Sequence, residues 1–316
     1  MSGSKRPKDE GRLIQLVYYA YVAAAAIARA LPERWSYRFA SFAGAMQARL
    51  AKKKRHQVEK NLARITGQPA ESSRVQRLVL DAYRSYARYW LETFSLVLRD
   101  RDFFLERFYC PSQDNIDKVL ARGKGAVVVV GHLGNWDAAG AWVGARGNRL
   151  VTIAEVLKPR RMFDFFVEHR ARLGMKIYPA QAGVTDDIVR EVEGGAVVAI
   201  LGDRDLKGTG PEISLFGEKV TLPGGPASIA LRAGVPLMVA GVWGVKRADG
   251  TPAWEAEIST PIELPDDYDP ANITREQIVE LTRRYAPVLE ELIARRPEEW
   301  HVFQPFWPAD KPSTKS

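Results

Sequence analysis

A histidine, an asparagine and an aspartate lie close together in the segment GHLGNWD, residues 131–137. The segment directly follows AVVVV (126–130), an apolar β-branched run typical of a buried parallel strand. In doubly wound α/β folds, ligands bind at the carboxyl ends of such strands. We therefore expect His132 to act as a base and Asp137 to fix its tautomer. We expect Asn135 to cap the following helix and to contact substrate.

The alternative is a structural pair, in which His132 caps a helix and Asp137 adds a favourable charge to its first turn. A histidine and an aspartate five residues apart occur often by chance, so the spacing alone does not distinguish the catalytic from the structural interpretation. The flanking Gly131 and Gly134 and the position after a strand support the catalytic interpretation. Because the chain has no G-x-S-x-G nucleophile elbow, a histidine base indicates direct attack by a substrate hydroxyl.

Charged residues also follow the expected strands 150–154 and 197–201. They are Glu155 after the first strand and Asp203, Arg204 and Asp205 after the second. Three charges directly after an apolar strand fit a substrate site better than a solvated turn. Glu155 either binds substrate or is a helix-entry charge. Arg170 either holds a substrate group, pairs with Glu155 or is a surface arginine.

Strands that alternate with helices must position these residues. The expected strands are 126–130, 150–154, 176–178, 197–201, 236–242 and 254–264. The expected helices after the N-terminal segment are 74–98, 114–121, 137–146, 159–173, 184–193, 226–234 and 273–297. This alternation predicts an α/β fold with a central, mostly parallel sheet and helices on both faces.

The net charge of +8 is concentrated near the N-terminus. Residues 1–64 hold 14 Lys or Arg and 4 Asp or Glu, and the remaining 252 residues carry a net charge of −2. The uncharged run 13–28 is shorter than the roughly 20 strongly apolar residues of a membrane span. We expect two helices, 11–31 and 33–55, on an anionic membrane surface beside the basic run 52–55. The alternative is a buried helix with a solvated charged end.

We expect the helices of residues 1–64 to pack on the membrane and on an α/β core formed by residues 65–316. The single Cys110 cannot form an intrachain disulfide and excludes cysteine-based zinc and iron–sulfur sites. No motif predicts a metal or a cofactor. The basic cluster lacks a nucleic-acid-binding motif, so nucleic acid is not an expected partner.

The H-x4-D motif of His132 and Asp137, with several further blocks, resembles the glycerophospholipid acyltransferase superfamily. The closer resemblance is to its bacterial branch of lipid A acyltransferases and mycobacterial phosphatidylinositol mannoside acyltransferases, and it covers about residues 12–308. Lipid A enzymes usually carry Glu where this chain has Asp137, which favours the mannoside enzymes. The blocks are KNLARITG (60–67), SYARYWLETF (85–94), GHLGNWDAAGAW (131–142), TIAEVLKP (152–159), FxxxR (166–170), 202–227 and PEEWHVFQPFWP (297–308).

The resemblance implies transfer of a palmitoyl-like chain from the co-substrate acyl-CoA. The acceptor is the 6-hydroxyl of the mannose at the inositol 2-position of a phosphatidylinositol mannoside. His132 would be the base and Asp137 its orienting carboxylate. Glu212 matches a further catalytic carboxylate, or is a loop charge. Candidates for the CoA phosphates are Arg204, Lys158, Arg160 and Arg161.

Two other functions stay open at this point. One is a lipid A acyltransferase that uses acyl carrier protein, and the other is a non-catalytic lipid-binding protein. For the acyltransferase we expect a peripheral or monotopic protein on the cytoplasmic face of the cell membrane. The aromatic helix 83–98 and the helix 226–234 are candidates to line an acyl-chain groove.

Overall fold

The computed structural model describes residues 32–266 and 268–310 and six residues nearer the N-terminus. These six residues, all helical, are Tyr19, Ala23, Ala25, Ala26, Ala28 and Ala30. Most of the helix expected over 11–31 therefore lies outside the described residues. The remaining expected elements fall within the described ranges.

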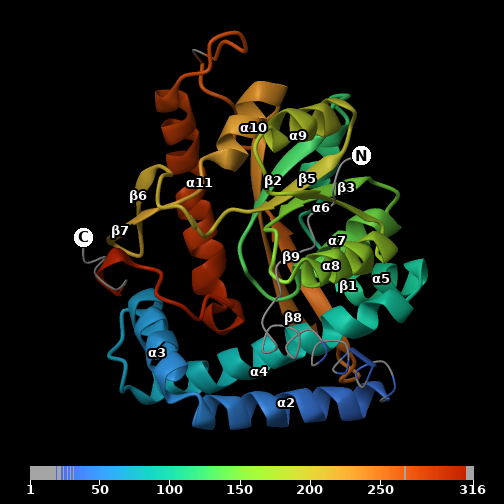
Figure 1. Cartoon of the computed structure of the whole chain (residues 1–316), viewed down its shortest axis with the longest axis vertical. Coiled ribbons are helices and arrows are strands. Elements are labelled where there is room, and N and C mark those ends of the chain that lie inside the picture. The colour runs from blue at the N-terminus through green and yellow to red at the C-terminus, as the bar shows by residue number, and fades with distance from the viewer. Residues whose placement is uncertain are drawn as a thin grey trace, which may run out of the picture.

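A seven-stranded sheet forms the centre of the molecule, in the order β1-β9-β8-β2-β5-β3-β4 (Figure 1). Its neighbouring strands are parallel except for the antiparallel pair β8–β9. The prediction of an α/β fold with a mostly parallel sheet is confirmed. The strands are β1 (Phe108–Tyr109), β2 (Ala126–Val130), β3 (Leu150–Ala154), β4 (Met175–Pro179), β5 (Val197–Leu201), β8 (Leu237–Lys246) and β9 (Pro252–Ile258).

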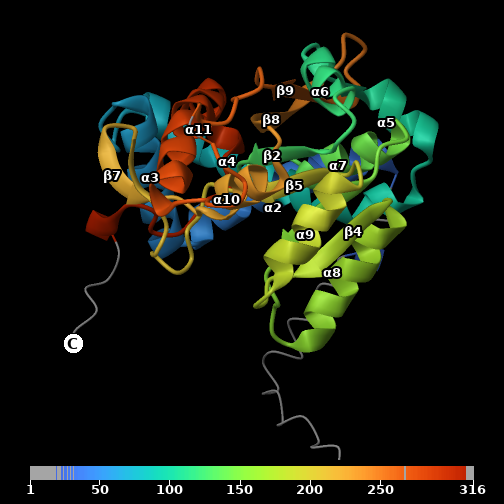
Figure 2. The same ribbon diagram turned by 90° about the horizontal axis from the view of Figure 1, so that it is seen from above.

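Helices cover both faces of the sheet. Side chains alternate along each buried strand, so each strand contributes apolar side chains to a core on either face. Val127 and Val129 of β2 belong to one core cluster, and Ala126 and Val128 belong to the other. The helices of the first cluster are α9 (Val184–Glu193), α10 (Gly225–Ala233) and α11 (Arg275–Arg295). Those of the second cluster are α5 (Arg101–Arg107), α6 (Gln113–Leu120) and α7 (Trp136–Ala145). Figure 2 shows α8 (Arg160–Arg172) beside the edge strand β4.

A layer of helices precedes the sheet in sequence and lies along the lower side of Figure 1. It consists of α2 (Glu33–Leu50), α3 (Lys52–Thr66) and α4 (Ser73–Ser95). The prediction of one helix over 33–55 is wrong, because the backbone bends at Ala51, with φ −86° and ψ 55°. The bend lets Leu62 of α3 pack against Val79 of α4. Within the described ranges, no helix combines the length and the apolar character needed to cross a bilayer.

Two further segments differ from the expected pattern. The strand expected over 254–264 ends at Ile258, and Ile262 then makes an isolated bridge to Leu237. The segment between β5 and α10, for which no strand or helix was expected, contains a hairpin, β6 (Glu212–Leu215) and β7 (Glu218–Thr221). In a short strand only every second side chain is buried. The apolar content of such a segment is therefore close to that of a loop and does not distinguish the two.

Candidate active site

The loop of residues 131–135 joins β2 to α7 at the carboxyl edge of the sheet. Asn135 caps α7 as expected, because its side-chain oxygen accepts a hydrogen bond from the Ala138 N–H at 3.0 Å. Its amide nitrogen donates to Glu92 Oε2 of α4 at 2.9 Å. The side chain is buried and does not line the cavity beside His132, so Asn135 anchors the loop to the helical layer and the expected contact with substrate has no support from geometry.

The C-terminal segment holds the same loop from another side. The Gly134 N–H donates to the Glu299 carbonyl at 2.9 Å, and the His301 N–H donates to the His132 carbonyl at 2.8 Å. Gly134 has φ +53°, and a Cβ there would lie 2.4 Å from the carbonyl oxygen of Val242. Only glycine fits this close approach, so the backbone on the C-terminal side of His132 is fixed.

Asp203, which follows β5, is the carboxylate that binds His132. Its Oδ1 lies 2.6 Å from His132 Nδ1, and its Oδ2 accepts from the His132 backbone N–H at 2.8 Å. Trp300 Nε1 donates to the same Oδ2 at 2.8 Å. Asp203 is fully buried, whereas His132 keeps 18 % of its side chain exposed. A carboxylate at Nδ1 fixes the tautomer that leaves Nε2 free to accept a proton.

Burial alone would raise the pKa of Asp203. The charge of His132 and the hydrogen bonds from His132 and Trp300 outweigh burial, so the pKa lies below its usual value. Asp203 is therefore ionised at neutral pH. An ionised partner stabilises the imidazolium that forms when His132 takes up a proton.

The expectation that Asp137 orients His132 is corrected by this geometry. Asp137 Oδ1 accepts from Arg170 Nε at 2.7 Å, and Oδ2 accepts from Tyr89 and Thr93 hydroxyls at 3.2 and 3.3 Å. No hydrogen bond or ion pair joins it to His132 within the part of the chain that the structure describes. The first turn of α7 directs the Asp137 side chain towards α4 and α8, whereas His132 faces the end of β5.

A cavity of about 440 Å³ opens beside His132 and runs between the sheet and α7. Its size lies within the range of about 300 to 1,000 Å³ that small-molecule sites occupy. Its walls are mostly apolar, and α7 contributes the small Ala139 and Gly140 there. They include Phe108, Ile116, Val128, Trp142, Ala199 and Ile258. The expectation that the helices over 83–98 and 226–234 line the groove is wrong for this cavity.

Five of the predicted site residues line the cavity together. They are His132, Asp137, Glu155, Arg170 and Arg204. Arg170 pairs with Asp137, not with Glu155, which is solvent-exposed at the cavity. Asp203 lies behind His132 and supports it.

The structure does not bring the other predicted residues to His132. Asp205 accepts from the backbone N–H groups of Lys207 and Gly210, so it stabilises its own loop. Glu212 lies on the β6–β7 hairpin with a 62 % exposed side chain, and Lys219 pairs with it at 2.9 Å. Its predicted catalytic role therefore has no support from geometry.

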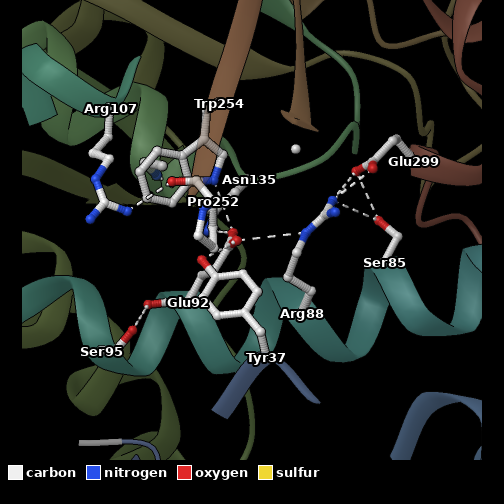
Figure 3. Close-up of polar contacts among 12 residues, drawn as sticks. Tyr37, Ser85, Arg88, Glu92, Ser95, Arg107, Asn135, Pro252, Trp254 and Glu299 are labelled. Atoms are coloured by element: carbon white, nitrogen blue, oxygen red, sulfur yellow. Dashed lines mark hydrogen bonds and ion pairs between the residues drawn. The ribbon is translucent and has the colours of Figure 1, made fainter. Parts of the chain in front are cut away.

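A buried polar network beneath the loop was not predicted from the sequence (Figure 3). Glu92 accepts from Tyr37, Asn135 and Trp254 at 2.8, 2.9 and 2.9 Å. Arg88 lies 3.6 Å from Glu92 and donates to Glu299 at 2.6 Å. Burial raises the pKa of Glu92, although these donors oppose it. No local spacing reveals the network, because its members come from α2, α4, β9 and the C-terminal segment.

The fold and site define an α/β protein with a carboxylate-paired histidine at an apolar cavity. The chain belongs to the bacterial lipid A biosynthesis acyltransferase family, whose model matches residues 6–308. Family membership supports an enzyme that acylates a lipid. Its relatives include phosphatidylinositol mannoside acyltransferases of Mycobacterium tuberculosis and Mycolicibacterium smegmatis. The protein of M. tuberculosis strain H37Rv is 32% identical, with 98% of this chain and 95% of the relative covered. The M. smegmatis protein is 30% identical over 80% of each.

Proposed function

We propose that the protein transfers a long acyl chain, typically palmitoyl, from acyl-CoA to the 6-hydroxyl of a mannose of phosphatidylinositol mannoside. The observation that carries this proposal is the His132–Asp203 pair beside an apolar cavity. The names of the relatives support the glycolipid acceptor. No metal or cofactor enters the proposed reaction, and acyl-CoA is consumed as a co-substrate.

In the proposed reaction the acceptor hydroxyl attacks the thioester carbonyl carbon directly. His132 Nε2 takes the hydroxyl proton as the C–O bond forms, while Asp203 stabilises the imidazolium. Backbone N–H groups in the first turn of α7 are suited to stabilise the tetrahedral oxyanion. Collapse of the intermediate breaks the C–S bond, and the proton leaves with the CoA thiol.

The cavity suits the acyl chain, because its walls are apolar and it begins at the proposed base. At its mouth, Glu155 is suited to accept hydrogen bonds from sugar hydroxyls. Arg204, which also lines the cavity, is a candidate for a CoA phosphate or pyrophosphate oxygen. The exposed Lys158 and Arg161 are further candidates, whereas Arg160 pairs with Asp164 at 2.9 Å.

We further propose that the protein works as a peripheral or monotopic protein on the cytoplasmic face of the cell membrane. The exposed aromatic residues of α2 and the exposed Lys52, Lys53 and Lys54 of α3 support an anionic bilayer as the partner. Arg55, which the sequence groups with these lysines, instead binds Glu59 and Gln76. Nucleic acid is not a proposed partner.

The second candidate is a lipid A acyltransferase that uses acyl carrier protein, because the matching family model bears that description. The two functions differ in both donor and acceptor. Palmitoyl-CoA and palmitoyl-acyl carrier protein should therefore be tested with a mannosylated phosphatidylinositol and with a lipid A precursor. Product formed only from the lipid A precursor would reject the first proposal.

The mechanism is tested by His132→Ala, with His56→Ala as the matched control on the exposed surface of α3. We expect His132→Ala to lower kcat by at least about a thousandfold, because it removes the base. Circular dichroism should show that both variants are folded. Near-normal turnover in His132→Ala would reject the general-base mechanism.

A further inference from the structure

A second groove, of about 780 Å³, lies between α2, α4 and the end of β8. It shares no lining residue with the cavity beside His132. Its charged lining residues are Arg38, Arg49, Arg84, Arg88, Lys246 and Arg296, with Asp81, Glu298 and Glu299. Six cations against three carboxylates give a net formal charge of +3, so the groove favours an anionic ligand.

Three of these cations have no ion-pair partner among the described residues. Arg84 and Arg88 are neutralised by carboxylates of the groove, at 3.1 and 2.6 Å. Arg38, Arg49 and Lys246 are solvent-exposed and make no ion pair with any residue that the structure describes. Arg38 Cζ lies 5.5 Å from the centroid of the Trp35 ring, so this cation has an aromatic neighbour but no carboxylate within the described ranges. Arginine and lysine side chains without a carboxylate partner are the usual ligands of phosphate groups.

The groove also contains groups that suit hydroxyls. Ser41 contributes an exposed hydroxyl group, and Asp81 and Glu298 contribute carboxylate oxygens. A bare anion gains nothing from these carboxylates, whereas a polyol can donate hydrogen bonds to them. Cations and carboxylates in one groove therefore match a phosphate ester of a polyol.

An exposed apolar stripe on α2 adjoins the groove. Trp35, Phe39 and Phe42 repeat at helical spacing, and their exposed fractions are 53, 57 and 64 %. Phe42 also lines the groove. A soluble phosphate ester has no apolar part to place against this stripe, whereas a lipid in a bilayer does.

We propose that this groove binds the phosphorylated polyol headgroup of an anionic phospholipid. The phosphate lies at Arg38, Arg49 or Lys246, which make no ion pair with the described residues, and the polyol hydroxyls bond to the carboxylates. The bound lipid holds α2 on the bilayer and leaves the cavity beside His132 open to its own substrates. The site does not depend on the identity of the acyl donor or acceptor.

The test compares two triple variants that each remove three positive charges. The groove variant is Arg38→Gln, Arg49→Gln and Lys246→Gln, and the control is Lys52→Gln, Lys53→Gln and Lys54→Gln. Co-sedimentation with phosphatidylcholine vesicles that contain phosphatidylglycerol measures binding. We expect the groove variant to bind about tenfold more weakly than the control, because it loses specific phosphate contacts as well as charge.

A second arm identifies the source of the phosphate by calorimetry with the soluble headgroup glycerophosphoglycerol. Weak binding that the groove variant abolishes supports a lipid headgroup. Binding as tight as that of the vesicles, and lost in the groove variant, would overturn the assignment to a lipid in favour of a soluble phosphate ester. Equal loss of vesicle binding in the two triple variants would overturn the site itself. Thermal unfolding checks that all proteins are folded.

Discussion

At the scale of single residues, the site depends on which carboxylate meets the imidazole. Asp203 binds both Nδ1 and the backbone N–H of His132, so it fixes the ring in two places. Asp137 is committed to Arg170. The orienting carboxylate is therefore supplied by the end of another strand, 71 residues away. The H-x4-D spacing locates the loop that carries His132 but does not identify the carboxylate that binds it.

Asp203→Asn tests this assignment. An amide retains the shape but no longer stabilises the imidazolium and can hold the wrong tautomer, so we expect kcat to fall by about 10² to 10⁴ with little change in KM. The control is Asp205→Asn, the same change two residues on, where the carboxylate accepts from the backbone of its own loop and bonds Thr221 of β7. Equal losses in the two variants would contradict the pairing with His132.

His301 should make stability depend on pH. It is buried against Ser85, and burial together with the charges of Arg88 and His132 keeps its pKa well below 6.5. Below pH 6.5 the imidazole of His301 is protonated in the unfolded chain but stays neutral in the folded protein. The free energy of unfolding therefore falls as the pH falls.

Between pH 7 and 5.5 we expect His301 to account for about 1 kcal/mol of lost unfolding free energy. The measurement is urea unfolding at both pH values, with His301→Gln as the comparison because glutamine does not titrate. If the unfolding free energy falls by the same amount between these pH values in the wild type and in His301→Gln, His301 does not cause the pH dependence.

At the scale of elements, small residues of α7 leave space for the cavity beside the larger Trp142 of the same helix. Ala139 and Gly140 face the sheet where larger side chains would fill the space. A Cβ at Gly140 would come within 2.5 Å of the Met175 sulfur, so this helix packs closely at β4 as well. The same composition therefore provides both close packing and an open channel.

Ala256→Leu should shorten the acyl chain that the enzyme prefers. Ala256 of β9 is buried and lines the cavity, so a larger side chain reduces the length available. Ala253→Leu is the control, since Ala253 is equally buried on the same strand but does not line the cavity. The measurement is relative kcat/KM for acyl-CoA donors of increasing length. An unchanged preference in Ala256→Leu would reject the cavity as the acyl site.

At the scale of the whole molecule, Trp35 and Phe39 of α2 present exposed aromatic surface to solvent. Replacing Trp35 and Phe39 by Ser should weaken vesicle binding several-fold without lowering the unfolding temperature, because their exposed surface adds little to folding. The control replaces Leu98 and Tyr109, which are 61 and 64 % exposed elsewhere, by Ser. Vesicle binding that falls equally in both would show that α2 has no special role.

The sequence by itself determined the α/β class, the position of His132 after a buried strand and the family of the chain. These depend on local patterns, namely apolar runs, helical periodicity and short motifs. The predictions made from the sequence failed at Ala51, at the end of β9 and in the β6–β7 hairpin. They failed because tertiary packing decides where an element bends or ends. The division into residues 1–64 and 65–316 remains a prediction.

Only the tertiary structure decided that Asp203 binds His132, that Asp137 binds Arg170 and that Glu212 lies apart. Parallel β2 and β5 pair in register, which brings their carboxyl ends together. The C-terminal segment then adds Trp300 to the same carboxylate. These contacts join residues far apart in the chain, and their geometry depends on strand order and register, which no local spacing encodes.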